Sequence, residues 1–147
     1  MESEFKLDLE RRSRLFAKLL LIHAVVTFAA GIVLVVAPEL IPSSVNIQLD
    51  PGAYLVCYLL AGCEFGVAAL SFGARRLTDP AALRLISRSF IVMHASTALV
   101  EVYAYVRGGL SVGLWANVAL RVAVCAVFAR FGFPQDEQPS NRPGAGK

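Results

Sequence analysis

The chain has 147 residues and a formal net charge of +3 at pH 7; 56% of its residues are hydrophobic and 17% are charged. Soluble domains carry about a quarter charged residues, and here most charges lie at the two ends and in one loop. The composition therefore indicates a membrane protein and argues against a soluble domain with a large core. No basic patch interleaved with aromatic residues occurs, so nucleic acid is not an expected partner.

The sequence carries no signature of catalysis. The three cysteines, Cys57, Cys63 and Cys125, lie inside apolar stretches without CxxC spacing, which supports neither a disulfide framework nor a thiol redox motif. Nothing resembles a hydrolase triad, a P-loop or a zinc site. A non-enzymatic role is therefore the leading expectation.

The N-terminal part predicts a cytosolic lead-in followed by a first membrane span. Residues 1–14 carry charges of both signs and are too long and acidic for the start of a signal peptide. Leu15 to Val36 has about the ~20 residues that a bilayer requires, and the Ala37-Pro38 pair ends it. His23 and Thr27 share one face of this predicted helix.

A proline-rich loop precedes the second predicted span. Residues 38–52 contain three prolines and no Lys or Arg, and Val45, Ile47 and Leu49 alternate with polar residues, which favours a short extended piece. The second span runs from Ala53 to Gly73, with Glu64 at its middle. Gly62 and Gly66 form a GxxxG pattern, which would let another helix approach closely.

The remaining two spans are predicted to form an antiparallel pair. Asp79 and Pro80 are typical of an N-cap and a first helical residue, so the third helix is expected from Pro80 to about Val106. Arg107-Gly108-Gly109 makes a tight connection to a fourth span from about Leu110 to Phe131. Residues 133–147 are rich in Pro, Gly and polar residues and are expected to form a disordered tail.

Together these elements predict an all-α fold, an integral membrane four-helix antiparallel bundle over residues 15–132. Lys and Arg concentrate on one side of it, in the lead-in, between the second and third spans, and at the C-terminal end. These residues are Lys6, Arg11, Arg12, Arg14, Lys18, Arg75, Arg76, Arg84, Arg88, Arg130, Arg142 and Lys147. The other side has only Arg107, so both termini should be cytoplasmic and the protein should lie in the inner (cytoplasmic) membrane.

Depth along the spans decides which buried charges can meet. Glu64 and Arg121 each lie about midway along their spans, and Glu101 and Asn117 each lie roughly two turns from the outer end. Charged groups at this depth are expected to face the bundle and pair. Arg121 is therefore expected to contact Glu64, Glu101 or both. The cluster either fixes helix packing alone or forms a polar pocket or proton path.

The two histidines, His23 and His94, lie at similar depth, roughly two turns from the inner end of the first and third spans. Facing imidazoles at equal depth permit two interpretations. They form a hydrogen-bonded packing pair, or they ligate a b-type haem axially. No further sequence feature selects haem, so the packing pair is favoured and no cofactor is assigned.

Four features of the layout resemble one known family. These are the four-span plan, the Pro-rich first loop, the turn ARRLTDPAALR and the segment WANVALR in the fourth span. Together they resemble small bacterial four-span membrane proteins of the DoxX-like kind. The resemblance covers residues 15–132; it implies the architecture and transfers no site residues.

The sequence leads to one main functional expectation and one alternative. The main one is a small membrane protein that binds or moves a small molecule, or acts as an accessory subunit of a membrane complex. The polar cluster of Glu64, Glu101, Asn117, Arg121, His23 and His94 is then its candidate binding site. The alternative is a haem- or quinone-linked membrane redox protein. Expected partners are the lipid bilayer, and either a membrane protein or further copies of the same chain.

Overall fold

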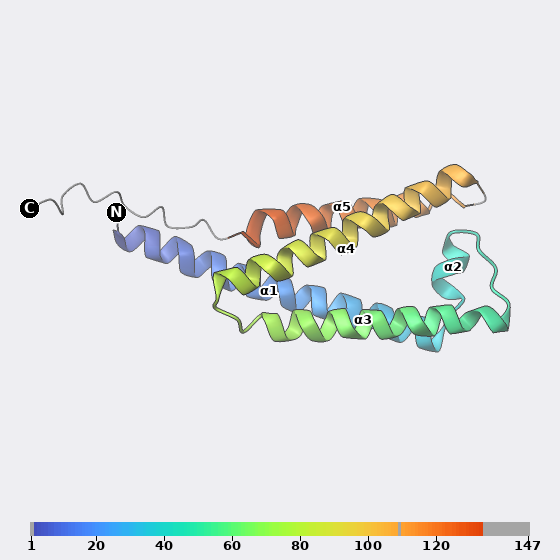
Figure 1. Ribbon diagram of the computed structural model, residues 1–147, viewed down its shortest axis with the longest axis horizontal. Helices are drawn as coiled ribbons and strands as arrows, with labels where there is room; N and C mark the ends of the chain where they lie inside the picture. The colour runs from blue at the N-terminus through green and yellow to red at the C-terminus, as the bar shows by residue number, and fades with distance from the viewer. Residues whose placement is uncertain (1, 109, 134–147) are drawn as a thin grey trace, which may run out of the picture.

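The computed structural model describes residues 2–108 and 110–133, and within them the fold is all-helical. Four long helices, α1 (Glu2–Val36), α3 (Tyr54–Ala74), α4 (Pro80–Arg107) and α5 (Leu114–Phe131), make up most of the chain (Figure 1). A short helix α2 (Leu40–Ser44) and a 3-10 turn η1 (Pro51–Ala53) lie in the first loop. All four long helices are long and apolar enough to cross a membrane. The tail expected at 133–147 lies outside the described residues from 134 onward.

The helix ends follow from local chemistry. Asp79 caps α4 as expected, because its carboxylate accepts hydrogen bonds from the backbone amides of Ala81 and Ala82 at 3.1 and 3.2 Å. Helix α1 already begins at Glu2, so the predicted lead-in is helical and continuous with the first span. Helix α5 begins at Leu114, later than predicted, because residues 111–113 form a turn in which the Ser111 hydroxyl accepts from the Gly113 amide.

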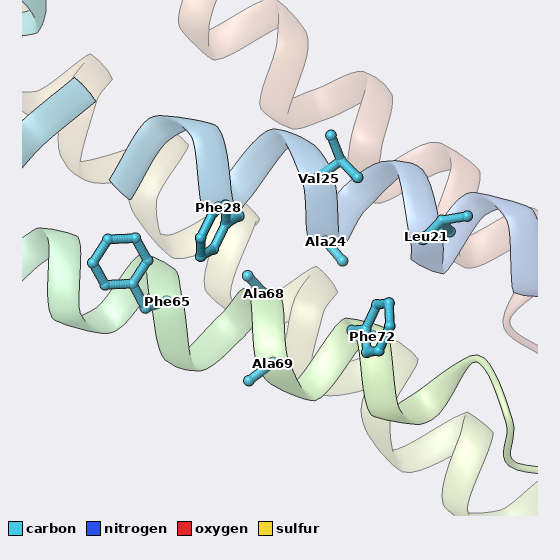
Figure 2. Close-up of a pocket in the computed structure, with 8 residues that line it drawn as sticks. All are labelled: Leu21, Ala24, Val25, Phe28, Phe65, Ala68, Ala69 and Phe72. Atoms are coloured by element: carbon cyan, nitrogen blue, oxygen red, sulfur yellow. The ribbon is translucent and has the colours of Figure 1, made fainter. Parts of the chain in front are cut away.

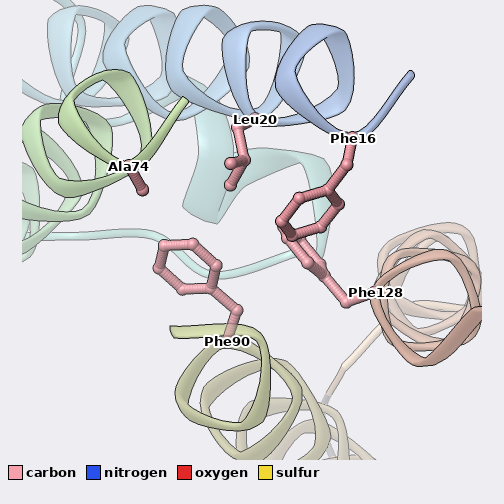
Figure 3. Packing of buried hydrophobic residues seen from close by; sticks show 5 residues of the cluster. All are labelled: Phe16, Leu20, Ala74, Phe90 and Phe128. Atoms are coloured by element: carbon pink, nitrogen blue, oxygen red, sulfur yellow. The ribbon is translucent and has the colours of Figure 1, made fainter. Parts of the chain in front are cut away.

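The helices associate as two pairs. Helix α1 lies along α3, and α4 lies along α5. The pairs meet near the α3–α4 connection, where an aromatic cluster fills the space between all four helices (Figure 3). Its buried members are Phe16, Leu20, Ala74, Phe90 and Phe128. Packing at this end is tight, since Phe128 and Leu20 are both fully buried.

At the opposite end the pairs separate, and the first loop lies between them (Figure 1). Val45 packs on a small cluster of Ala98, Leu114 and Val118 from α4 and α5. The Ser111 amide donates to the Val45 carbonyl at 3.2 Å, which fastens the loop to the α4–α5 connection. The short extended piece expected at Val45, Ile47 and Leu49 does not form a strand, since residues 45–46 make a turn and residues 47–50 have no regular secondary structure. The segment just before it, Leu40–Ser44, is helical. The helix pairs are thus joined by aromatic packing at one end and by the first loop at the other.

The outward faces of the helices are strongly apolar. Large aliphatic and aromatic side chains such as Val36, Val56, Leu99 and Tyr103 are exposed over more than 60% of their surface. Soluble monomers rarely expose apolar surface on this scale. The inward faces, in contrast, carry the buried polar side chains.

Candidate functional site

A direct hydrogen bond between two histidines joins the two helix pairs. His23 on α1 and His94 on α4 approach through their Nε2 atoms at 3.0 Å. Both side chains are buried, with 8% and 7% of their surface exposed. The His23 ring also packs against Phe90 and Phe128, with ring centroids 4.8 and 5.2 Å away. Both histidines therefore face the bundle at the same depth, as the sequence predicted.

Each imidazole has a second partner on its other ring nitrogen. His23 Nδ1 lies 2.8 Å from the hydroxyl of Ser71 on α3, and that hydroxyl lies 2.9 Å from the Val67 carbonyl. His94 Nδ1 lies 3.5 Å from Nη1 of Arg121 on α5, a long hydrogen bond. One chain of polar contacts therefore crosses all four long helices.

The direction of hydrogen bonding along this chain follows from Arg121. A guanidinium group can only donate, so His94 Nδ1 must accept and its proton must lie on Nε2. His94 then donates to His23 Nε2, which leaves the His23 proton on Nδ1, where it donates to Ser71. The Ser71 hydroxyl donates in turn to the Val67 carbonyl. In this arrangement both ring nitrogens of each histidine and the Ser71 hydroxyl have hydrogen-bond partners, and both histidines are neutral.

The outer part of the cluster is centred on the Glu101 carboxylate. Asn117 Nδ2 and Arg121 Nε both donate to its Oε1 atom, at 2.7 and 3.0 Å. The predicted contact between Arg121 and Glu101 is present, and Asn117 shares it, as expected for residues one turn apart on α5. The other carboxylate oxygen, Oε2, is buried and has no hydrogen-bond partner among the described residues.

Glu64 belongs to the cluster in a different way. It is half-buried on α3 and forms no ion pair within the part of the chain that the structure describes. The charge of Arg121 acts on its carboxylate, but the guanidinium bonds to Glu101 instead. The predicted contact of Arg121 with either carboxylate is thus realised only with Glu101.

Ser71 is the member of the chain that the sequence did not single out. It is fully buried and holds the His23 ring from α3. A serine in an apolar helix resembles any small packing residue. Only the equal depth of Ser71 and His23 along their helices could have identified Ser71 as a hydrogen-bond partner. Thr27, which shares the face of His23, instead binds the His23 and Ala24 carbonyls of its own helix at 2.8 and 3.2 Å.

The geometry of the histidines does not fit the haem hypothesis. A metal between two imidazole nitrogens lies about 2 Å from each, so those nitrogens would stand about 4 Å apart with a porphyrin between the rings. Here the Nε2 atoms lie 3.0 Å apart and bond to each other. Phe90 and Phe128 pack on the His23 ring, where a macrocycle would need space. Among the described residues, no group of three or more His, Cys, Asp or Glu could hold a metal ion.

An apolar groove lies apart from this cluster, on the outward side of α1 and α3 (Figure 2). It has a volume of about 340 Å³ and opens to the outside. Alanines line it between aromatic walls; its residues are Leu21, Ala24, Val25, Phe28, Phe65, Ala68, Ala69 and Phe72. The groove has no polar group to orient a ligand, so it suits acyl chains or an apolar helix face.

No protein-family model, no curated protein and no solved structure matches this chain. A helical architecture alone supports many functions, so only the chemistry of the site itself bears on the function of this chain.

Proposed function

We propose that the chain is a multi-pass protein of the cytoplasmic membrane, with its four long helices antiparallel and both termini in the cytoplasm. Support comes from the hydropathy of all four helices and from their exposed apolar side chains, which hydrocarbon would cover. The Lys and Arg distribution supports the orientation. The layout-level resemblance to DoxX-like proteins belongs to the same proposal.

Within the membrane, the protein binds a small molecule at the cluster of Glu101, Arg121, Asn117 and Glu64, and holds or moves it. The observation that carries this function is the free oxygen of Glu101. Two donors converge on Oε1, whereas Oε2 is buried without a partner. An unsatisfied buried acceptor costs roughly 1–3 kcal/mol and more when charged, so a purely structural cluster gains nothing from it. A ligand that donates a hydrogen bond removes this cost.

The test is the small-molecule content of the purified protein. Native mass spectrometry in mild detergent should detect a bound small molecule in the wild type. Glu101→Gln should lose it, because the substitution replaces a charged acceptor. Ser96→Ala is the matched control, since Ser96 lies exposed on the same helix and bonds only to the Met93 carbonyl. If wild type and both variants carry the same lipids and nothing else, the proposed function is wrong.

The apolar groove favours a second candidate, an accessory subunit of a membrane complex. Its alanine floor and aromatic walls offer a shaped surface to an apolar helix. A stable complex should then be purified from the native membrane, and Ala69→Trp, which fills the groove, should release the partner. If Glu101→Gln releases the partner and Ala69→Trp does not, the partner binds through the polar cluster and not through the groove.

A further inference from the structure

The ionisable groups of the polar cluster would carry an uncompensated negative charge if all of them were ionised. The cluster contains two carboxylates and one guanidinium: Glu64 and Arg121, each about midway along its span, and Glu101, roughly two turns from the outer end of its span. The histidines add nothing, because the hydrogen bond from Arg121 leaves both imidazoles neutral. With all three groups ionised, two negative charges and one positive charge would leave a net charge of −1 within the spans, and an isolated charge at the bilayer centre costs roughly 2.5–3.5 kcal/mol.

The unpartnered oxygen of Glu101 points to how that charge is compensated. The Oε2 atom is buried and free, so the compensating species must reach an enclosed acceptor. A proton also neutralises the charge, but on Glu101 Oε2 it would form a buried hydroxyl, and that atom has no hydrogen-bond partner among the described residues. An ammonium group supplies one positive charge and also N–H donors for Oε2. A metal ion is less suitable, since no group of three or more potential ligand residues occurs among the described residues.

We propose that the cluster binds a small organic ammonium ion in exchange for a proton. The proposal rests on the small-molecule function above and names its substrate class and its coupling ion. Glu101 provides the free acceptor at Oε2, while Glu64 provides the second negative charge. Arg121 stays bonded to Glu101 Oε1 throughout, so the ligand does not have to displace it.

The exchange balances in atoms and charge. Without ligand, one carboxylate holds a proton, which makes the cluster neutral within the hydrocarbon. When the ammonium enters, the O–H bond of that carboxylic acid breaks and the proton leaves to water. The carboxylate left behind pairs with the ammonium, so the cluster is neutral in both states. Only one of the two cations occupies the cluster at a time, and this competition would couple ligand movement to proton movement in the opposite direction.

Proton release on binding is the direct test. Purified protein in weakly buffered detergent is titrated with n-butylammonium, and a pH-sensitive dye reports released protons. The wild type and the Ser96→Ala control should release about one proton for each ammonium bound. n-Butanol, which has the same chain without the charge, should release none. Tetramethylammonium, which lacks N–H donors, should bind about tenfold more weakly or worse.

Two variants separate the roles of the carboxylates. Glu64→Gln removes the excess charge, so proton release should vanish. Glu101→Gln places an amide at the free acceptor, so binding should weaken about tenfold or more as well. If the wild type releases no proton with butylammonium, or both variants release as many as the wild type, the inference is wrong. The small-molecule function would still hold in that case if the wild type carries a neutral bound compound that the Glu101→Gln variant lacks.

An infrared measurement on the wild type alone guards against variants that fail to fold. The ligand-free protein should show the carbonyl band of one protonated carboxylic acid within the membrane domain. Butylammonium should remove this band, and n-butanol should leave it unchanged. A ligand-free spectrum without the band, or a band that butylammonium does not alter, would overturn the exchange.

Discussion

Arg121 donates from Nε to Glu101 Oε1 across 3.0 Å, whereas Glu64, which lies in its electrostatic field, has no ion pair among the described residues. The pairing partner of Arg121 is therefore the carboxylate on the adjacent helix α4. Removing one member of a buried ion pair typically costs ~3–5 kcal/mol, because the other charge is left uncompensated. The Arg121 and Glu101 side chains keep 21% and 15% of their surface exposed, so the lower part of this range is expected.

The first prediction concerns the coupling within this pair. Arg121→Gln and Glu101→Gln should each lower the free energy of unfolding in detergent by roughly 3 kcal/mol. The double variant should lose less than the sum of the two single losses, because each change removes the same interaction. Thermal unfolding of the four proteins measures this coupling.

The matched control for this cycle pairs Arg121→Gln with Glu64→Gln. Glu64 forms no ion pair with the residues that the structure describes, so its coupling to Arg121 should be clearly smaller than that of Glu101. Equal coupling for the two carboxylates would contradict the assignment of the pair.

Depth along the helices predicts much of this cluster from sequence. It predicts two pairs, Glu101 with Asn117 and His23 with His94, because side chains at equal depth on neighbouring helices can meet. Depth does not choose between Glu64 and Glu101 as the partner of Arg121, since that choice depends on the rotation of each helix about its axis. The short helix at Leu40–Ser44 also escapes prediction, because a five-residue segment has no periodicity to read.

The second prediction concerns Ser71. Ser71→Ala should lower the free energy of unfolding by about 1–3 kcal/mol, because it leaves the buried Nδ1–H of His23 without an acceptor. Ser89→Ala is the control, since Ser89 is exposed and bonds only to the Leu85 carbonyl of its own helix. Thermal unfolding in one detergent compares the two variants. A loss no greater for Ser71→Ala than for Ser89→Ala would show that Ser71 does not hold the imidazole.

The third prediction concerns two glycines with opposite surroundings. A Cβ at Gly31 would lie 2.5 Å from the Phe65 ring on α3, so Gly31→Ala should destabilise the α1/α3 pair. A Cβ at Gly66 would meet nothing within 4 Å, so Gly66→Ala should leave the stability of one chain unchanged or raise it by up to about 1 kcal/mol.

The Gly66 variant also tests the GxxxG pattern. Among the described residues, a Cβ at Gly62 or Gly66 would meet nothing within 4 Å, so the pattern is open to a second copy or a partner helix. If Gly66→Ala lowers stability as much as Gly31→Ala, and a cross-linked dimer disappears with it, Gly66 lies in an interface between two copies. If Gly66→Ala and Gly31→Ala lower stability equally and no oligomer forms, the difference between the crowded Gly31 and the open Gly66 would be wrong, and with it the packing of α1 on α3.

The fourth prediction is the orientation in the membrane. Reporter fusions at the N-terminus and after Phe131 should report the cytoplasm, and a reporter inserted at Asn46 should report the opposite side. The reason is the excess of Lys and Arg on the side of the termini. A cytoplasmic signal from Asn46 would reverse the topology.

The protonation of His23 and His94 decides the charge of the whole cluster, because two neutral imidazoles add nothing to the charges of Glu64, Glu101 and Arg121. The chain contains only these two histidines, so nitrogen-15 labelling of histidine gives four ring resonances without background, provided purification avoids a histidine tag. At pH 7 the spectrum should show His94 protonated on Nε2 only and His23 protonated on Nδ1 only. A doubly protonated ring, or a proton on Nδ1 of His94, would contradict the account.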